Sequence, residues 1–140
     1  MNDKKPIIGV GVIIENAQGK ILIAKRKKKV PKYSITGGAV EVGETFEQAA
    51  IREVKEETNL TITNPQVIAV TNNLETYQET GWHTVSIILL AKEFSGTLQV
   101  MEPEKSEKWF WCDPKILQEP HFDASRLGVQ CYLEKKFYIS

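Results

Sequence analysis

The sequence predicts an α+β domain in which one central helix lies between the strands of a mixed sheet. Three observations indicate this class. Stretches rich in β-branched residues outnumber stretches with helical spacing, one well-marked helix lies in the first half of the chain, and further strand-like stretches follow it. The 140 residues, 41% of them hydrophobic, suffice for one ordinary domain, and we expect residues 1–140 to form it because no repeat or long linker divides them.

The predicted strands are runs of β-branched and apolar residues between turn residues. The first strand is expected at Ile7–Ile14, followed by a turn at Asn16–Lys20 and a second strand that starts at Ile21–Ala24, so this region suggests a β-hairpin. The later elements are expected strands at Gln66–Asn72, Thr84–Ala91 and Trp109–Cys112, and a closing helix from Asp123 to Phe137.

The central helix is predicted over Thr45–Thr58 from signals at both of its ends. Thr45 can cap the first turn, and Gln48 three residues later completes a capping box. Asn59 is expected to end the helix, because Asn is the next best residue after Gly for a left-handed position at a helix end.

Composition excludes several classes of protein. The chain has 18 Lys and Arg against 18 Asp and Glu, so no overall basic field would hold it on nucleic acid. No apolar run approaches the roughly 18 residues that cross a bilayer, and the β-branched start is not typical of a signal peptide. Two cysteines, Cys112 and Cys131, are more typical of core or surface positions than of a disulfide or metal pair. We therefore expect a cytoplasmic protein without a membrane or stable nucleic-acid partner.

Three glutamates gather on one side of the expected helix. At about 100° per residue, Glu53, Glu56 and Glu57 fall in one narrow sector. The same sector contains apolar residues of the earlier turns, so the three acids are expected to point toward the protein body; these residues are Phe46, Ala49 and Ala50. Like charges at this spacing destabilise a helix by about 0.2–0.5 kcal/mol per pair, and the helix dipole disfavours acids in the last turns. The pattern fits either a solvated acidic face or a site for Mg²⁺ or Mn²⁺, which would reverse both effects.

The stretch Gly37–Leu60 resembles the Nudix box, G-x5-E-x7-R-E-U-x-E-E-x-G-U with U apolar. The residues on the pattern are Gly38, Glu44, Arg52, Glu53, Val54, Glu56, Glu57 and Leu60. The single departure is Asn59, where the family has Gly. The match covers spaced residues of unlike chemistry, so the chain is similar to Nudix hydrolases at the positions that carry their chemistry.

This resemblance implies a fold, a cofactor and a set of residues. The fold is a Nudix-type α/β/α sandwich, with the box helix packed against a mixed sheet, and the reaction is Mg²⁺- or Mn²⁺-dependent cleavage of a phosphoanhydride bond. The metal ligands that it implies are the backbone carbonyl of Gly38 and the carboxylates of Glu53, Glu56 and Glu57. Which glutamate is ligand and which is general base differs among members. Arg52 is implied to pair with acids of the box, Glu44 among them, and to complete the catalytic set.

A longer resemblance, to the MutT-like nucleotide-triphosphate diphosphatases, concerns other parts of the chain. It is carried by Gly9–Val12, by His83 within Trp82–Ile87, and by Met101–Lys105 followed by Trp109–Trp111. It implies that Glu104 is an additional acid near the metal. For substrate binding it implies Arg26 at the phosphates and Ile35, Ser86 and Phe122 around the nucleobase. Thr36 stands where relatives usually have Pro, and Lys27–Lys29 are at least as well explained as a solvated basic loop.

Three functions are weighed. The main expectation is hydrolysis of a nucleoside triphosphate, including a modified one, to the monophosphate and pyrophosphate. The alternative within the family is cleavage of a nucleoside diphosphate derivative such as ADP-ribose, whose usual hallmark downstream of the box is not evident. A non-catalytic nucleotide-binding module is disfavoured because the box keeps all its acids. The branch also implies a homodimer, which no residue specifically indicates.

Overall fold

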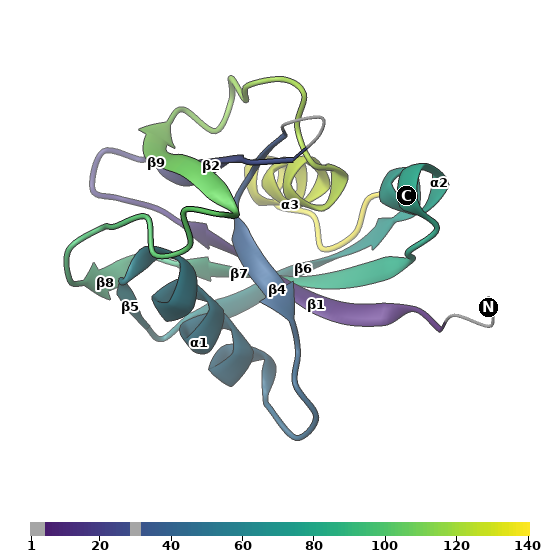
Figure 1. Cartoon of the computed structure of the whole chain (residues 1–140), viewed down its shortest axis with the longest axis horizontal. Helices are drawn as coiled ribbons and strands as arrows, with labels where there is room; N and C mark the ends of the chain where they lie inside the picture. Colours follow the sequence, from purple (N-terminus) through teal and green to yellow (C-terminus); the bar gives the residue numbers. More distant parts are fainter. Residues whose placement is uncertain (1–4, 29–31) are drawn as a thin grey trace.

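A four-stranded mixed sheet forms the centre of the computed structural model, which describes residues 5–28 and 32–140 (Figure 1). Strand β1 pairs in parallel with β7 and antiparallel with β4, and β6 pairs antiparallel with β7. The strands in spatial order are β4 (Thr36–Ala39), β1 (Ile7–Ile14), β7 (Thr84–Ala91) and β6 (Gln66–Asn73). Lys29, the last residue of the predicted basic loop, lies outside the described residues.

Two smaller sheets and three helices complete the described fold. The three-stranded sheet has the order β3 (Tyr33–Ser34), β2 (Ile21–Arg26), β9 (Ser106–Cys112), and β5 (Thr61–Thr63) pairs with β8 (Glu93–Ser95). The helices are α1 (Phe46–Thr58), α2 (Leu74–Thr80) and α3 (Asp123–Glu134). Over the described residues, none of the helices has the length and apolar character that a membrane span requires.

Helices α1 and α3 cover opposite faces of the central sheet (Figure 1). Alternate residues of β1 point to opposite faces, so Val12 and Ile14 pack in the core under α1, whereas Ile13 packs in the core with Val129 of α3. Burying one such side chain contributes about 1.5–3 kcal/mol. The expected α/β/α sandwich, with the central helix packed on a mixed sheet, is confirmed.

The predicted hairpin of β1 and β2 is wrong, although its turn forms. Asn16 Oδ1 accepts the backbone N–H of Lys20 at 2.9 Å, and Gly19 takes φ 77°. After one bridge between Glu15 and Ile21 the strands separate, β1 into the central sheet and β2 between β3 and β9. Both strands carry consecutive buried apolar residues, which is typical of strands covered on both faces and leaves no polar face for a solvated hairpin.

The other predicted elements are confirmed with small changes at their ends. Strand β7 has the predicted bounds, β6 extends one residue further to Asn73, and β9 begins earlier, at Ser106. Helix α3 ends at Glu134 rather than at Phe137, and Lys135 follows in the left-handed conformation. The sequence did not indicate five elements, β3, β4, β5, β8 and α2, which are too short to show a periodic pattern.

Candidate active site

Both ends of α1 form as the sequence predicts. The Thr45 hydroxyl accepts the backbone N–H of Gln48 at 3.0 Å, and the Gln48 side chain accepts the N–H of Thr45 at 2.9 Å, which is a complete capping box. Asn59 ends the helix in the left-handed conformation, φ 68°, and its N–H donates to the carbonyl of Lys55. These caps fix which residues occupy the last two turns, where the glutamates lie.

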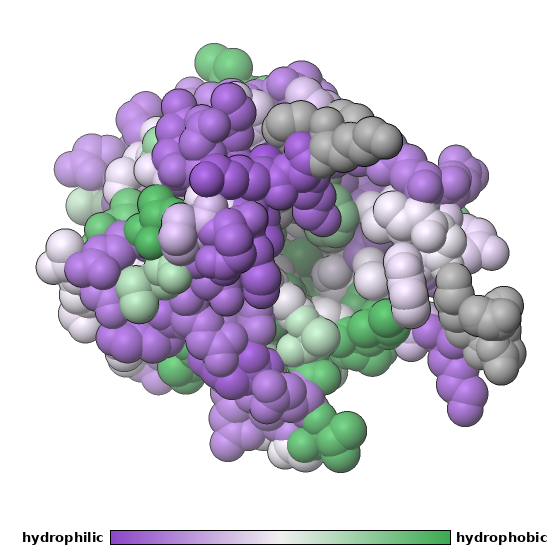
Figure 2. Space-filling model, in the orientation of Figure 1, coloured by the Kyte–Doolittle hydropathy of each residue, from purple (hydrophilic) through white to green (hydrophobic). Residues whose placement is uncertain are grey.

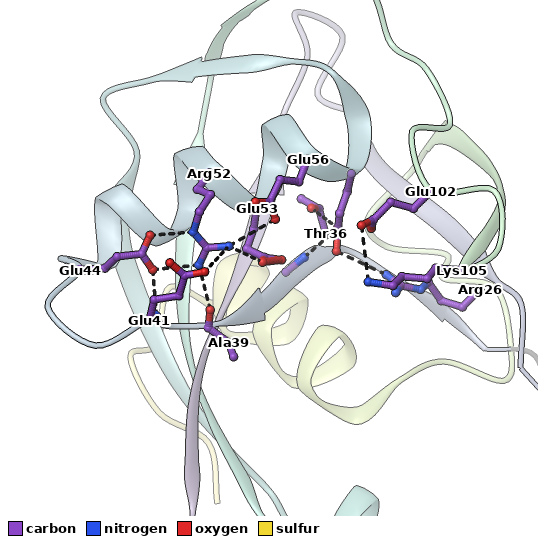
Figure 3. A network of polar contacts seen from close by, with 12 residues as sticks. Arg26, Thr36, Ala39, Glu41, Glu44, Arg52, Glu53, Glu56, Glu102 and Lys105 are labelled. Carbon is purple, nitrogen blue, oxygen red and sulfur yellow. Dashed lines mark hydrogen bonds and ion pairs between the residues drawn. The ribbon is translucent and has the colours of Figure 1, made fainter.

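Arg52 joins the acids of this helix to the loop before it (Figure 3). Its Nε and Nη2 donate to the two carboxylate oxygens of Glu44 at 2.7 and 2.8 Å, which is the expected pair. Its Nη1 donates to Glu53 at 2.8 Å and to Glu56 at 3.3 Å, and Nη2 also reaches the Ala39 carbonyl at 3.0 Å. The hydrogen bond from Arg52 lowers the pKa of Glu44 to about 2, so Glu44 stays ionised.

Glu57 is the buried acid of the group, with 7% of its surface exposed. Oε1 accepts hydrogen bonds from the Thr36 hydroxyl at 2.5 Å and from the Gly37 N–H at 3.3 Å, while Oε2 lies 3.9 Å from Nη1 of Arg26. Burial raises the pKa of Glu57 to about 7, and the negative charge of Glu53 adds to the rise. Strands β2 and β4 therefore supply the groups that hold this carboxylate.

The other two glutamates differ in exposure. The Glu53 side chain is 14% exposed and lies against β4, where a Cβ built at Gly38 would come within 2.0 Å of its Oε2. The Glu56 side chain is 51% exposed, so the prediction that all three acids point inward is wrong for Glu56. The reason is helix geometry, because Glu56 lies about 100° around the helix from Glu57. Phe46, expected on the inward stripe, is 38% exposed in the first turn.

A fourth acid near these glutamates comes from the loop before β9, and it is Glu102. Burial is the largest cause of the raised pKa of Glu53, and the negative charges of Glu56 and Glu102 add to the rise. Lys105 pairs with Glu102 at 3.4 Å, and the Lys27 N–H donates to the Lys105 carbonyl, which fastens the loop to the end of β2. Glu104, expected from the resemblance at this place, is exposed, and no hydrogen bond or ion pair joins it to another described residue. The sequence alone does not show which of Glu102 and Glu104, two residues apart on one turn, faces the other acids.

The carboxylate oxygens of Glu53 and Glu57 are of the chemical type that hard divalent cations bind. Burial raises the pKa of both Glu53 and Glu57, so their negative charge is incompletely compensated by the neighbouring cations. No three carboxylate, imidazole or thiol groups among the described residues converge on one point as metal ligands. In this arrangement Arg52 and Thr36 hold oxygens of Glu53 and Glu57 instead.

A cavity of about 290 Å³ opens on the other side of β4, between β1, β7 and the start of α3. Its floor is low because β1 places Gly9 and Gly11 there, and a Cβ at Gly11 would lie 3.0 Å from Ile88 Cδ1. Figure 2 shows a recess near the centre of this face, with hydrophobic and weakly polar residues inside it. All four residues expected to bind substrate line the cavity, Arg26, Ile35, Ser86 and Phe122.

The cavity reaches the acids through residues that belong to both. Thr36, Gly37 and Gly38 of β4 line it, and the same residues contact Glu57 and Glu53. Arg26 lines it as well, and its buried Nε has no hydrogen-bond partner within the described part of the chain. Lys28 and Lys32 also line the cavity, and Lys32 is ion-paired with Glu79 at 2.6 Å.

Comparisons with known proteins agree with this geometry. The family model described as NUDIX domain matches residues 5–129. An ADP-ribose pyrophosphatase of Methanocaldococcus jannaschii is 34% identical over 133 residues, which are 94% of this chain and 75% of that protein. The NAD-capped RNA hydrolase NudC of Actinobacillus succinogenes is 31% identical over 126 residues, and this chain spans only 44% of its length. A crystal structure of a MutT NUDIX hydrolase from Burkholderia pseudomallei superposes with a TM-score of 0.82 at 29% identity, covering 91% of this chain and 98% of that one.

Proposed function

Because this chain belongs to the Nudix family of hydrolases, which cleave acid anhydrides of phosphorus, we propose that its substrate is a nucleoside triphosphate, released as the monophosphate and pyrophosphate. The proposal rests on one observation, the continuity of the cavity with the acids through β4. A nucleoside in the cavity would direct its phosphates past Arg26 toward Glu53 and Glu57. The volume of about 290 Å³ is at the small end for ligand pockets, which favours one nucleoside over the two of a dinucleotide.

The proposed roles follow from the position of each group. Gly38, Glu53, Glu56 and Glu57 would hold Mg²⁺ or Mn²⁺, which neutralises phosphate charge and lowers the pKa of a bound water. Glu57, which Thr36 and the Gly37 N–H hold at the wall of the cavity, is the candidate to accept the proton of the attacking water. Arg26 would bind a phosphate oxygen through its Nε–H, which has no hydrogen-bond partner among the described residues. Arg52 and Glu44 would keep Glu53 and Glu56 in place rather than touch substrate.

The additional acid is proposed to be Glu102 in place of Glu104. Glu102 is the acid of this loop whose charge acts on Glu53, and its side chain is only 29% exposed. From there a carboxylate can bind a second ion or orient the attacking water. Lys105 beside it would then have to give up its ion pair when the site fills.

ADP-ribose is the second candidate substrate, favoured by the similarity to the pyrophosphatase of Methanocaldococcus jannaschii over most of both chains. It also carries one nucleoside and a diphosphate, so the same cavity and cations would serve. Its products would be AMP and ribose 5-phosphate.

A substrate panel with Mg²⁺ decides between these candidates. The four ribonucleoside and four deoxyribonucleoside triphosphates, one oxidised purine triphosphate and ADP-ribose are incubated separately, and pyrophosphate, orthophosphate and nucleoside monophosphate are quantified. We expect pyrophosphate with an equal amount of monophosphate from at least one triphosphate. Release of orthophosphate instead, or turnover of ADP-ribose alone, would overturn the triphosphate proposal.

A further inference from the structure

Beneath the floor of the cavity lies Asn73, the last residue of β6, which is fully buried. Its Nδ2 donates to the hydroxyls of Thr84 at 2.8 Å and Ser86 at 3.0 Å, both on β7. Its Oδ1 accepts the hydroxyl of Thr71 at 2.8 Å. Both amide hydrogens and the amide oxygen are therefore engaged, which fixes the orientation of the side chain.

These bonds determine what the two β7 hydroxyls can offer. A hydroxyl has one hydrogen to donate, and Thr84 and Ser86 each accept from Asn73 without donating to any other described residue. Both side chains line the cavity. Asn73 occupies one of the two lone pairs on each oxygen, and neither O–H has an acceptor among the described residues, so the O–H groups are left to donate toward a ligand on the floor.

Ser125 at the start of α3 is arranged in the opposite way. His121 Nδ1 lies 3.1 Å from the Gln118 carbonyl, which can only accept, so Nδ1 carries the hydrogen and Nε2 accepts. Burial lowers the pKa of His121, which keeps this ring neutral. The Ser125 hydroxyl, 2.6 Å from Nε2, thus donates to His121, and its oxygen also accepts the Ile35 N–H at 3.0 Å. Ser125 lines the cavity but has no hydrogen left for a ligand.

We infer that Asn73 is a positioning residue that orients Ser86 and Thr84 as hydrogen-bond donors, so that the cavity selects a nucleobase by acceptor atoms on the edge facing β7. The inference rests on the proposed function only in taking the ligand to be a nucleobase. A ring nitrogen or carbonyl oxygen on that edge satisfies the hydroxyls. A donor there can reach only the second lone pair of a hydroxyl oxygen and leaves the O–H without an acceptor, and an unpaired buried polar group weakens binding.

Binding measurements test the inference without turnover. The affinities of AMP, GMP, CMP and UMP are measured by calorimetry in EDTA, followed by analogues of the tightest binder that each lack one acceptor or one donor. For wild type, removal of one acceptor is expected to weaken binding at least tenfold. Ser86→Ala should bind the parent nucleotide at least tenfold more weakly and should lose less than a further twofold when that acceptor is removed. Removal of a donor should not couple to Ser86.

Asn73→Leu tests the positioning role, because it keeps similar volume and removes the amide. It should reproduce the lost acceptor preference of Ser86→Ala, and in turnover it should raise KM about tenfold with kcat nearly unchanged. Thr71→Val is the matched control, since it disturbs the same buried group but leaves both Asn73 donors in place, and it should keep the preference. If it loses the preference equally, if none of the four nucleotides binds, or if acceptor removal does not couple to Ser86, the inference is wrong. If binding shows the coupling but no triphosphate is cleaved, only the proposed function fails.

Discussion

The hydroxyl of Thr36 donates a 2.5 Å hydrogen bond to Oε1 of Glu57, the most buried acid of the site. The resemblance drawn from the sequence implies that relatives usually have Pro at this position. Proline has no group that can donate to a carboxylate. In this chain the substitution therefore reaches the acid, because the hydrogen bond favours the ionised form of Glu57 and opposes the effect of burial on its pKa.

Glu57→Gln is expected to lower kcat by at least 100-fold, because the amide can neither accept the proton of an attacking water nor bind a cation as a carboxylate does. Steady-state turnover of the best substrate at saturating Mg²⁺ measures this. Glu47→Gln, on the exposed first turn of the same helix, is the matched control and should retain wild-type turnover. Undiminished activity of wild type after exhaustive metal stripping with EDTA would contradict the metal-dependent role.

The metal-free protein should lose stability as pH rises. Below pH 4.5 Glu57 is protonated both folded and unfolded, whereas between 4.5 and about 7 the folded form binds the proton more tightly. Stability is therefore highest at the acid end of this window, falls through pH 7 and is level above it. The shift corresponds to about 3 kcal/mol at about 1.36 kcal/mol per pKa unit.

Urea unfolding of wild type and Glu57→Gln in EDTA, at pH 5 and pH 8, measures this effect. The variant should lose clearly less stability between the two pH values, the remainder coming from Glu53, whose pKa is also raised. The same variant should equal or exceed wild type in stability at pH 8. Identical pH dependence of the two proteins would show that Glu57 titrates normally.

Asn59→Val should cost about 1 kcal/mol or more, because a β-branched residue is strained at φ 68°. Asn59→Gly relieves backbone strain but loses the hydrogen bond from the Asn59 side chain to the Thr97 carbonyl at 3.0 Å, so it should be near neutral. Thermal unfolding distinguishes the two variants. Equal melting temperatures would mean that the helix does not depend on this end.

Glu102→Ala should lower kcat at least tenfold with little change in KM, because its carboxylate acts at the acids rather than on the nucleoside. Glu104→Ala, on the same turn and exposed, is the matched control and should be close to wild type. Steady-state kinetics at saturating Mg²⁺ measures both. The reverse result would restore Glu104, the residue that the sequence resemblance indicated.

What the sequence predicted well is encoded within a few neighbouring residues. The capping box of Thr45 and Gln48 and the left-handed Asn59 depend on local backbone geometry, and all three form as expected. The separation of β1 from β2 depends instead on which distant strand each one pairs with. Asn73 gave no signal either, since its role arises only when β6 and β7 align it with Thr84 and Ser86.

Strand β4 is a partition with different chemistry on its two sides. Its residues touch the acids of α1, whereas the rest of the cavity wall comes from β1, β7 and the start of α3. A substitution at Ser86 or Phe122 can thus change which ligand the cavity accepts without displacing a carboxylate. Gly37 and Gly38 have no such freedom, because a Cβ at either would meet the Val10 carbonyl at 2.2 Å or the Glu53 carboxylate at 2.0 Å. Mutation of the far walls alone is therefore expected to alter the substrate range, whereas a change in β4 also disturbs the acids.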